Sequence, residues 1–177
     1  MAEEVTFLGP LELTGGIWGV GDATRPGTHW VEFRPDGLHQ HEPDAGGRLV
    51  PWSRIMTGIR FSWNKSSRST QSKGEYTLWG TVAGRSGGWM HMTLRDPYED
   101  HALRFDRHAR RYRSVDAVRL EWMLRHLVDV GRLPLLGDPG WVGRAVAGLA
   151  GGKQSWSTAA LRRVVVEAVT AAGPGRA

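Results

Sequence analysis

The chain contains no cysteine, and only three of its 23 basic residues are lysine. The absence of cysteine excludes a disulfide framework, a thiol nucleophile and any metal site built from thiolates. No apolar run approaches the roughly 18 residues that a membrane-spanning helix needs. The acidic start, Met1–Glu4, lacks the basic residues of a secretory signal, so we expect a cytoplasmic protein. The composition that remains, 177 residues of which 40% are hydrophobic, is typical of a globular protein.

Arginine and tryptophan are the residues in excess. Arginine outnumbers lysine 20 to three, and glycine is abundant at 24 residues. This bias is typical of a GC-rich bacterium, so arginine abundance alone does not indicate a recognition surface. Eight of the nine tryptophans precede residue 145, in segments with strand character. We predict that they pack in a core rather than form a ligand platform.

Strand patterns occupy the first 95 residues. His29–Phe33 alternates between apolar and polar side chains and leads into Pro35-Asp36-Gly37, a tight-turn signature. Gly37–Glu42 is therefore predicted to be the return strand of a hairpin. A second hairpin is predicted from Tyr76–Val82 and Trp89–Leu94, which flank a glycine-rich turn.

After residue 113 the apolar period becomes helical. Ser114 is predicted to cap a helix that Gly131 ends. Asp138-Pro139 predicts the start of a short second helix, and a last helix is predicted from about Ser157 to Ala172. The apolar stripe of the first helix comprises Leu120, Met123, Leu124, Leu127 and Val128, with Trp122 on or beside it.

A run of strands followed by an amphipathic helix resembles the bacterial pleckstrin-homology-like (PH-like) domains over residues 28–131. The resemblance also rests on a hairpin ending in Asp36-Gly37-Leu38 and on the run Val50-Pro51-Trp52-Ser53-Arg54-Ile55. It implies an interaction scaffold that binds lipid head groups, peptides or proteins. The first hairpin offers only Arg34 and Arg48, so the lipid-binding property is not implied for this chain.

We predict an α+β fold, with an antiparallel β-barrel or sandwich of PH-like form that is capped by an amphipathic helix and followed by a C-terminal helical tail. The β-rich domain is predicted to span residues 1–137, with the capping helix at 114–131, and the tail to span 138–177. Trp52 is predicted to point inward from the sheet. The tail helices are expected to pack on the domain or to form a homo-oligomer.

Two glycine-rich motifs invite an enzymatic interpretation. Gly84-Arg85-Ser86-Gly87-Gly88 matches the G-x-S-x-G nucleophile elbow, but it lies between two predicted strands, where glycines close a hairpin. Gly151-Gly152-Lys153-Gln154-Ser155 lacks both the first glycine of a phosphate loop and the Ser or Thr after its lysine. We predict that Ser86 is a solvated turn residue and that the protein is not an enzyme.

The segment His39-Gln40-His41-Glu42 is the best match to a metal site, because His39 and His41 share one face of a strand. Such a site needs a third and usually a fourth ligand, and His29 could supply one from across the hairpin. A solvent-facing strand end explains the same pair, and we predict no metal and no cofactor.

The basic segment Arg104–Arg125 has seven arginines against three carboxylates and so holds nearly all of the net charge of +5. Phe105 and Tyr112 lie between the arginines, an arrangement that suits contacts with bases and phosphates. A solvated linker and helix face in an arginine-rich chain also explains the segment, and we favour this interpretation. The candidate anion-binding residues are Arg104, Arg107, Arg110 and Arg111.

The sequence therefore predicts a non-enzymatic, cytoplasmic interaction module of PH-like architecture that binds a protein or a small ligand. The alternative is an accessory protein that binds nucleic acid or another polyanion through Arg104–Arg125.

Overall fold

The computed structural model describes residues 6–64, 87–106, 108, 110–150 and 157–175. Their elements form an α+β fold of antiparallel sheets and helices, as the sequence predicts. The strands are β1 (Phe7–Leu8), β2 (Leu11–Thr14), β3 (Ile17–Val20), β4 (Trp30–Arg34), β5 (Gly37–Glu42), β6 (Ala45–Pro51), β7 (Arg60–Trp63), β8 (Gly88–Leu94) and β9 (Glu99–Phe105). The helices are η1 (Trp52–Arg54), α1 (Ser114–Asp129), η2 (Leu133–Gly137), α2 (Pro139–Leu149) and α3 (Thr158–Ala172).

Strands β1 to β6 form one antiparallel sheet in chain order, here called sheet A. The predicted hairpin is confirmed, because β4 pairs with β5 from Trp30 opposite His41 to Arg34 opposite Gly37. A Cβ atom on Gly37 would lie 2.2 Å from the carbonyl oxygen of Val50. The turn therefore requires glycine at this position, because β6 passes too close for any side chain.

Strands β7 to β9 form a second antiparallel sheet, sheet B. The second arm of the other predicted hairpin is present as β8, whereas residues 76–86 lie outside the described residues. On β8, Met90, Met92 and Leu94 face the core, and Trp89, His91 and Thr93 are half-buried on the opposite face. The alternation read from the sequence is confirmed.

The two sheets meet at two corners. At one corner Ile55 bridges Leu94, and at the other the amide of Asp106 donates to the carbonyl of His29 at 2.8 Å. Between them the buried side chain of Gln40 donates to the carbonyl of Arg104 and accepts from its amide. The described strands form no closed barrel, because the contact of β4 and β5 with β9 runs through this side chain and a single backbone bond rather than a continuous ladder.

The capping helix is present as α1, and four of the five residues of its predicted stripe are buried, with Val128 half-buried. Ser114 is not its cap: the N-cap is Arg113, whose side chain makes two 2.9 Å bonds to Asp116 in the first turn. A carboxylate there favourably faces the positive end of the helix dipole. At the other end the amide of Arg132 donates to the carbonyl of Leu127, and Gly131 has a φ of +67°.

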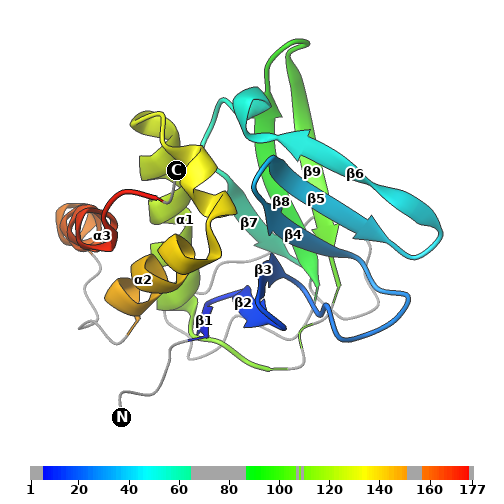
Figure 1. Ribbon diagram of the computed structural model, residues 1–177, viewed down its shortest axis with the longest axis horizontal. Coiled ribbons are helices and arrows are strands. Elements are labelled where there is room, and N and C mark those ends of the chain that lie inside the picture. The colour runs from blue at the N-terminus through cyan, green and yellow to red at the C-terminus, as the bar shows by residue number, and fades with distance from the viewer. Residues whose placement is uncertain (1–5, 65–86, 107, 109, 151–156, 176–177) are drawn as a thin grey trace.

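Helix α3 packs against α1 and α2, and α2 packs against sheet A, so all three α-helices lie on one side of the molecule (Figure 1). Asp138 caps α2 as predicted, by accepting from the amides of Gly140 and Trp141. The indole of Trp18 on β3 donates to the carbonyl of Pro139, which fixes α2 to sheet A. Among the described residues, no helix is long and apolar enough to cross a membrane.

Candidate functional site

A cavity of about 660 Å³ lies over sheet B and is bordered by helix α1; we call it the sheet B cavity. Arg60 on β7 and His91 on β8 line it from paired positions in the sheet. Trp122 and Arg125 line it from α1, at positions three residues apart on the helix. Volumes of 300–1,000 Å³ are usual for small-ligand sites, so the cavity has the size of a binding pocket.

The carboxylates of the sheet B cavity accept hydrogen bonds within the chain, whereas its two arginines make no ion pair with a described residue. Arg60 and Arg125 make no ion pair with any residue that the structure describes, although the Arg125 guanidinium lies 5.5 Å from the centre of the Trp122 ring. Glu121 accepts a 2.6 Å bond from the amide of Phe61. Asp100 accepts a 3.1 Å bond from a threonine hydroxyl of β8. Two guanidinium groups are thus available to a ligand that enters the cavity.

His91 is a neutral member of the same site. Burial and, after it, the charge of Arg60 lower the pKa of His91 below its ordinary value. Its Nε2 lies 2.7 Å from the hydroxyl oxygen of Ser62, on the neighbouring strand. A serine next to a neutral imidazole is one part of a hydrolytic site, but among the described residues no carboxylate is hydrogen-bonded to the His91 ring. The pair can offer a hydrogen bond to a ligand.

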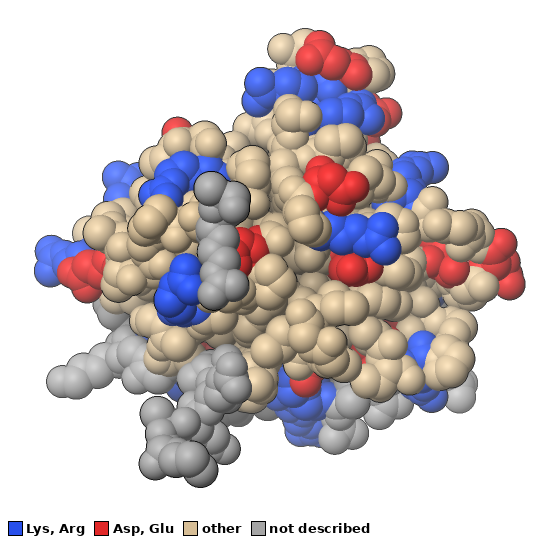
Figure 2. Space-filling model, viewed as in Figure 1, with Lys and Arg blue, Asp and Glu red and all other residues tan. Residues whose placement is uncertain are grey.

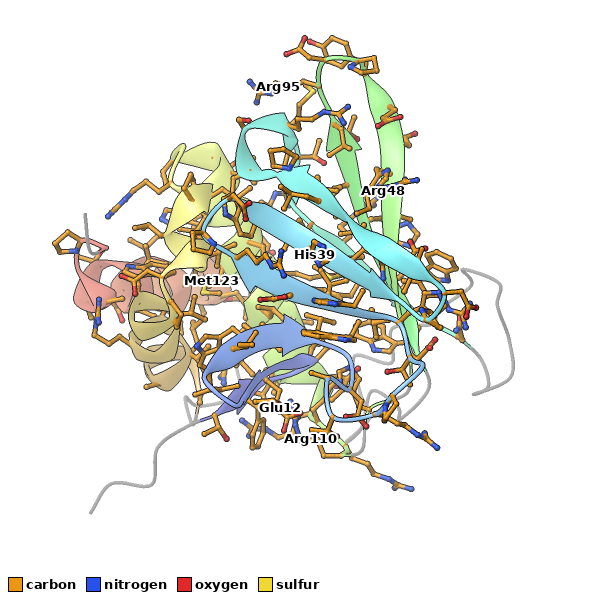
Figure 3. The ribbon with its side chains drawn as sticks, turned by 45° about the vertical axis from the view of Figure 1, so that its right-hand side comes forward. Glu12, His39, Arg48, Arg95, Arg110 and Met123 are labelled. Atoms are coloured by element: carbon orange, nitrogen blue, oxygen red, sulfur yellow. The ribbon has the colours of Figure 1, made fainter. Side chains whose placement is uncertain are left out.

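The basic segment is largely committed to contacts within the chain. Arg104 pairs with Asp106 at 3.0 Å. Arg110 pairs with Glu12 at 3.1 Å (Figure 3), stacks on the Phe7 ring and donates to the carbonyl of Gly9. On the face shown in Figure 2, acidic and basic side chains are interspersed.

The other two candidate arginines are Arg107 and Arg111. Arg111 is exposed, and residues 110–113 are not helical, so its neighbours are not aligned at helical spacing. Arg107 lies outside the described residues. Among the described residues, Arg104, Arg110 and Arg111 therefore do not share one helix face.

The histidine pair lies on the outer face of sheet A. His39 Nδ1 is 3.2 Å from His41 Nε2, and the latter is 2.7 Å from Glu32 Oε2. The third neighbour is thus Glu32. His29, which the sequence suggested could supply a third ligand, is not part of the cluster. His29 instead binds Asp106 through its backbone amide and Nδ1.

The charges around this cluster shift the pKa values of two of its members. Burial raises the pKa of Glu32, but hydrogen bonds from His41 and Arg34 outweigh it and leave the pKa below its ordinary value. Burial, then the charge of Arg34 and that of His41, lower the pKa of His39. The cluster therefore holds an ionised carboxylate beside a neutral imidazole at neutral pH.

The two glycine-rich motifs fall almost entirely outside the described residues. Ser86 and residues 151–155 are not described, while Gly87 precedes β8 and Gly88 begins it. The sheet B cavity was not anticipated from the sequence, since its residues come from the segment before β7 and from β7, β8, β9 and α1. The spacing of Trp122 and Arg125, which share one helix face, was the only local signal of it.

Comparisons of this chain with protein-family models, with curated proteins and with solved structures gave no match.

Proposed function

We propose that the chain is a non-enzymatic, PH-like binding module that holds a small anionic ligand in the sheet B cavity. The PH-like assignment is supported by the order of elements over residues 28–131, where antiparallel strands β4 to β9 are followed by α1 as a capping helix. Domains of this kind act mostly as interaction scaffolds, in keeping with a site where the described residues form a pocket but assemble no catalytic group.

The proposal rests on two arginines that line the cavity without an ion pair to any described residue. Arg60 and Arg125 line the sheet B cavity and have no carboxylate partner among the described residues. A carboxylate or phosphate can accept two parallel bonds from a guanidinium group. Trp122 and Met92 supply apolar surface beside these cations. The matching ligand has an anionic group and an apolar or planar part.

Polyanion binding through the basic segment has less support. Arg104 and Arg110 already have carboxylate partners, at 3.0 and 3.1 Å. A phosphate would have to displace Asp106 and Glu12 to reach them. Counterion release contributes to the binding free energy only through cations that contact a phosphate.

The proposed site can be tested by removing one of its cations. A panel of small aromatic carboxylates and phosphate monoesters is screened by thermal unfolding, since a ligand at about 100 times its Kd stabilises the folded state by about 2.7 kcal/mol. We expect Arg125→Ala to weaken binding of any hit at least about tenfold, because a charge-assisted hydrogen bond contributes about 1.5–3 kcal/mol. Isothermal titration calorimetry measures the change.

Arg163→Ala is the matched control. Arg163 is exposed on α3, which contributes no residue to the cavity lining, so the substitution removes the same charge outside the proposed site. Mass spectrometry of the ligand after incubation should show it unaltered, as expected for a binding module. A hit that binds Arg125→Ala and Arg60→Ala as tightly as the parent chain would place its site elsewhere and contradict the proposal.

A further inference from the structure

Three potential metal ligands converge on the outer face of sheet A, away from the residues of the sheet B cavity. The register of the hairpin sets Glu32 directly opposite His39 and places His41 two residues further along β5. Their neighbours Val31, Leu38 and Gln40 are buried, so the three polar side chains share the outward face. One nitrogen or oxygen atom from each lies within 4.8 Å of the other two.

Hydrogen bonding alone accounts poorly for this cluster. His41 Nε2 faces both Glu32 Oε2 at 2.7 Å and His39 Nδ1 at 3.2 Å. A protonated Nε2 has one hydrogen, which it can direct either to the carboxylate or to an unprotonated His39 Nδ1, so only one of the two contacts is then a linear hydrogen bond. An unprotonated Nε2 can accept from His39 but then faces the lone pairs of the carboxylate. A single cation between the three atoms would accept all three lone pairs.

Packing holds the two imidazole rings in place without a ligand. The Trp30 ring is stacked on His41, with centroids 3.9 Å apart and planes 3° from parallel. A Cβ atom on Gly47, which has a φ of +79°, would lie 2.5 Å from Cε1 of His39. Glycine at position 47 thus leaves the space that the His39 ring occupies. Ligands oriented in advance lose less freedom when an ion binds.

The donor set selects the class of ion. Two imidazole nitrogens and one carboxylate oxygen suit zinc and its neighbours in the first transition series, whereas calcium and magnesium prefer oxygen ligands only. Bonds of about 2.05 Å in a tetrahedral site put ligand atoms about 3.3 Å apart. The two histidine nitrogens are already 3.2 Å apart, whereas the 2.7 Å between His41 Nε2 and Glu32 Oε2 must lengthen when an ion binds. We propose that Glu32, His39 and His41 bind a divalent transition-metal ion, with the remaining coordination position open to water or to an external ligand.

The guanidinium group of Arg34 competes with a metal ion for this site. Nε of Arg34 lies 3.1 Å from the same Glu32 oxygen that approaches His41. An incoming ion must share that carboxylate with the guanidinium group or displace it. Removing the Arg34 charge should therefore tighten metal binding, whereas it would weaken a site for an anion.

The test is a titration of the full chain with zinc chloride, followed by calorimetry. We expect one ion per chain, and we expect Glu32→Gln and His39→Ala each to weaken binding at least about tenfold. Arg34→Gln should bind zinc more tightly than the parent chain. His126→Ala is the control, since it removes a half-buried histidine from α1 and leaves the sheet A cluster intact.

Glu32→Gln preserves the shape of the side chain and so keeps the test valid if His39→Ala unfolds. Circular dichroism verifies the fold of each variant. The proposal is overturned if the parent chain takes up no zinc, or if the folded Glu32→Gln variant binds zinc as tightly as the parent. The outcome is independent of the proposed function, because no residue of the metal cluster lines the sheet B cavity.

Discussion

Replacing Trp52 by alanine is expected to lower the free energy of unfolding by about 3–5 kcal/mol. Trp52 is 5% exposed and lies at the corner where sheet A gives way to the segment that bridges sheet B. Its indole nitrogen donates to the carbonyl of Arg34 at 3.0 Å, and its ring contacts the edge of Phe33. The truncation leaves a cavity. It also removes the indole N–H, which among the described residues is the only side-chain donor to the Arg34 carbonyl.

Thermal and urea unfolding measure the loss, which should appear as a fall in Tm of about 10 °C. Trp122→Ala is the matched control, because it removes the same side chain from a half-buried position beside the core. Trp122→Ala should lower the free energy of unfolding by less, since the half-buried Trp122 side chain buries less apolar surface on folding than Trp52 does. Equal melting temperatures for the two variants would show that Trp52 does not hold the corner between the sheets.

Elements with strong local signals were predictable from the sequence. The turn at Pro35-Asp36-Gly37 and the alternation on either side of it gave the β4–β5 hairpin. The apolar stripe at helical spacing gave α1, and Asp138-Pro139 gave the start of α2. In each case the decisive interactions are between residues close together in the chain.

The third member of the sheet A cluster could also have been found from the sequence. A two-residue turn at Pro35-Asp36 sets Arg34 opposite Gly37, and the same register sets Glu32 opposite His39. The turn is recognisable in the sequence, but His29, named from the sequence as a possible third ligand, pairs with no residue of β5. The register, more than the spacing of the histidines, determines which third side chain can reach them.

Features that depend on distant residues were not predictable in this way. Arg110 is held by Glu12 and by backbone carbonyls near it, from a strand at the other end of the β region. Counting charges within a segment cannot reveal such a partner, so the segment looked more available than it is. Likewise, the sheet B cavity exists only because α1 packs beside sheet B. Whether the sheets close into a barrel is decided by the corners between them.

The second large effect is expected from Asp116→Asn. Arg119 on α1 is only 2% exposed, and one of its guanidinium nitrogens lies 3.6 Å from Asp116 and 3.0 Å from the carbonyl of Leu149. Asp116 is 5% exposed and also accepts two bonds from Arg113. Asparagine keeps the shape of the side chain but removes the charge that compensates a buried cation. Such a change typically costs about 3–5 kcal/mol.

Urea unfolding at neutral pH tests this expectation, with Arg113→Ala as the control. Arg113 is exposed, so losing its pair with Asp116 should cost at most about 1 kcal/mol. Arg119→Met in the Asp116→Asn background should recover part of the loss, because the buried guanidinium charge that Asp116 compensates is then removed as well. The recovery is incomplete, since Arg119 also donates to Leu149 at the end of α2. If Asp116→Asn is as stable as Arg113→Ala, the carboxylate of Asp116 does not stabilise the buried Arg119.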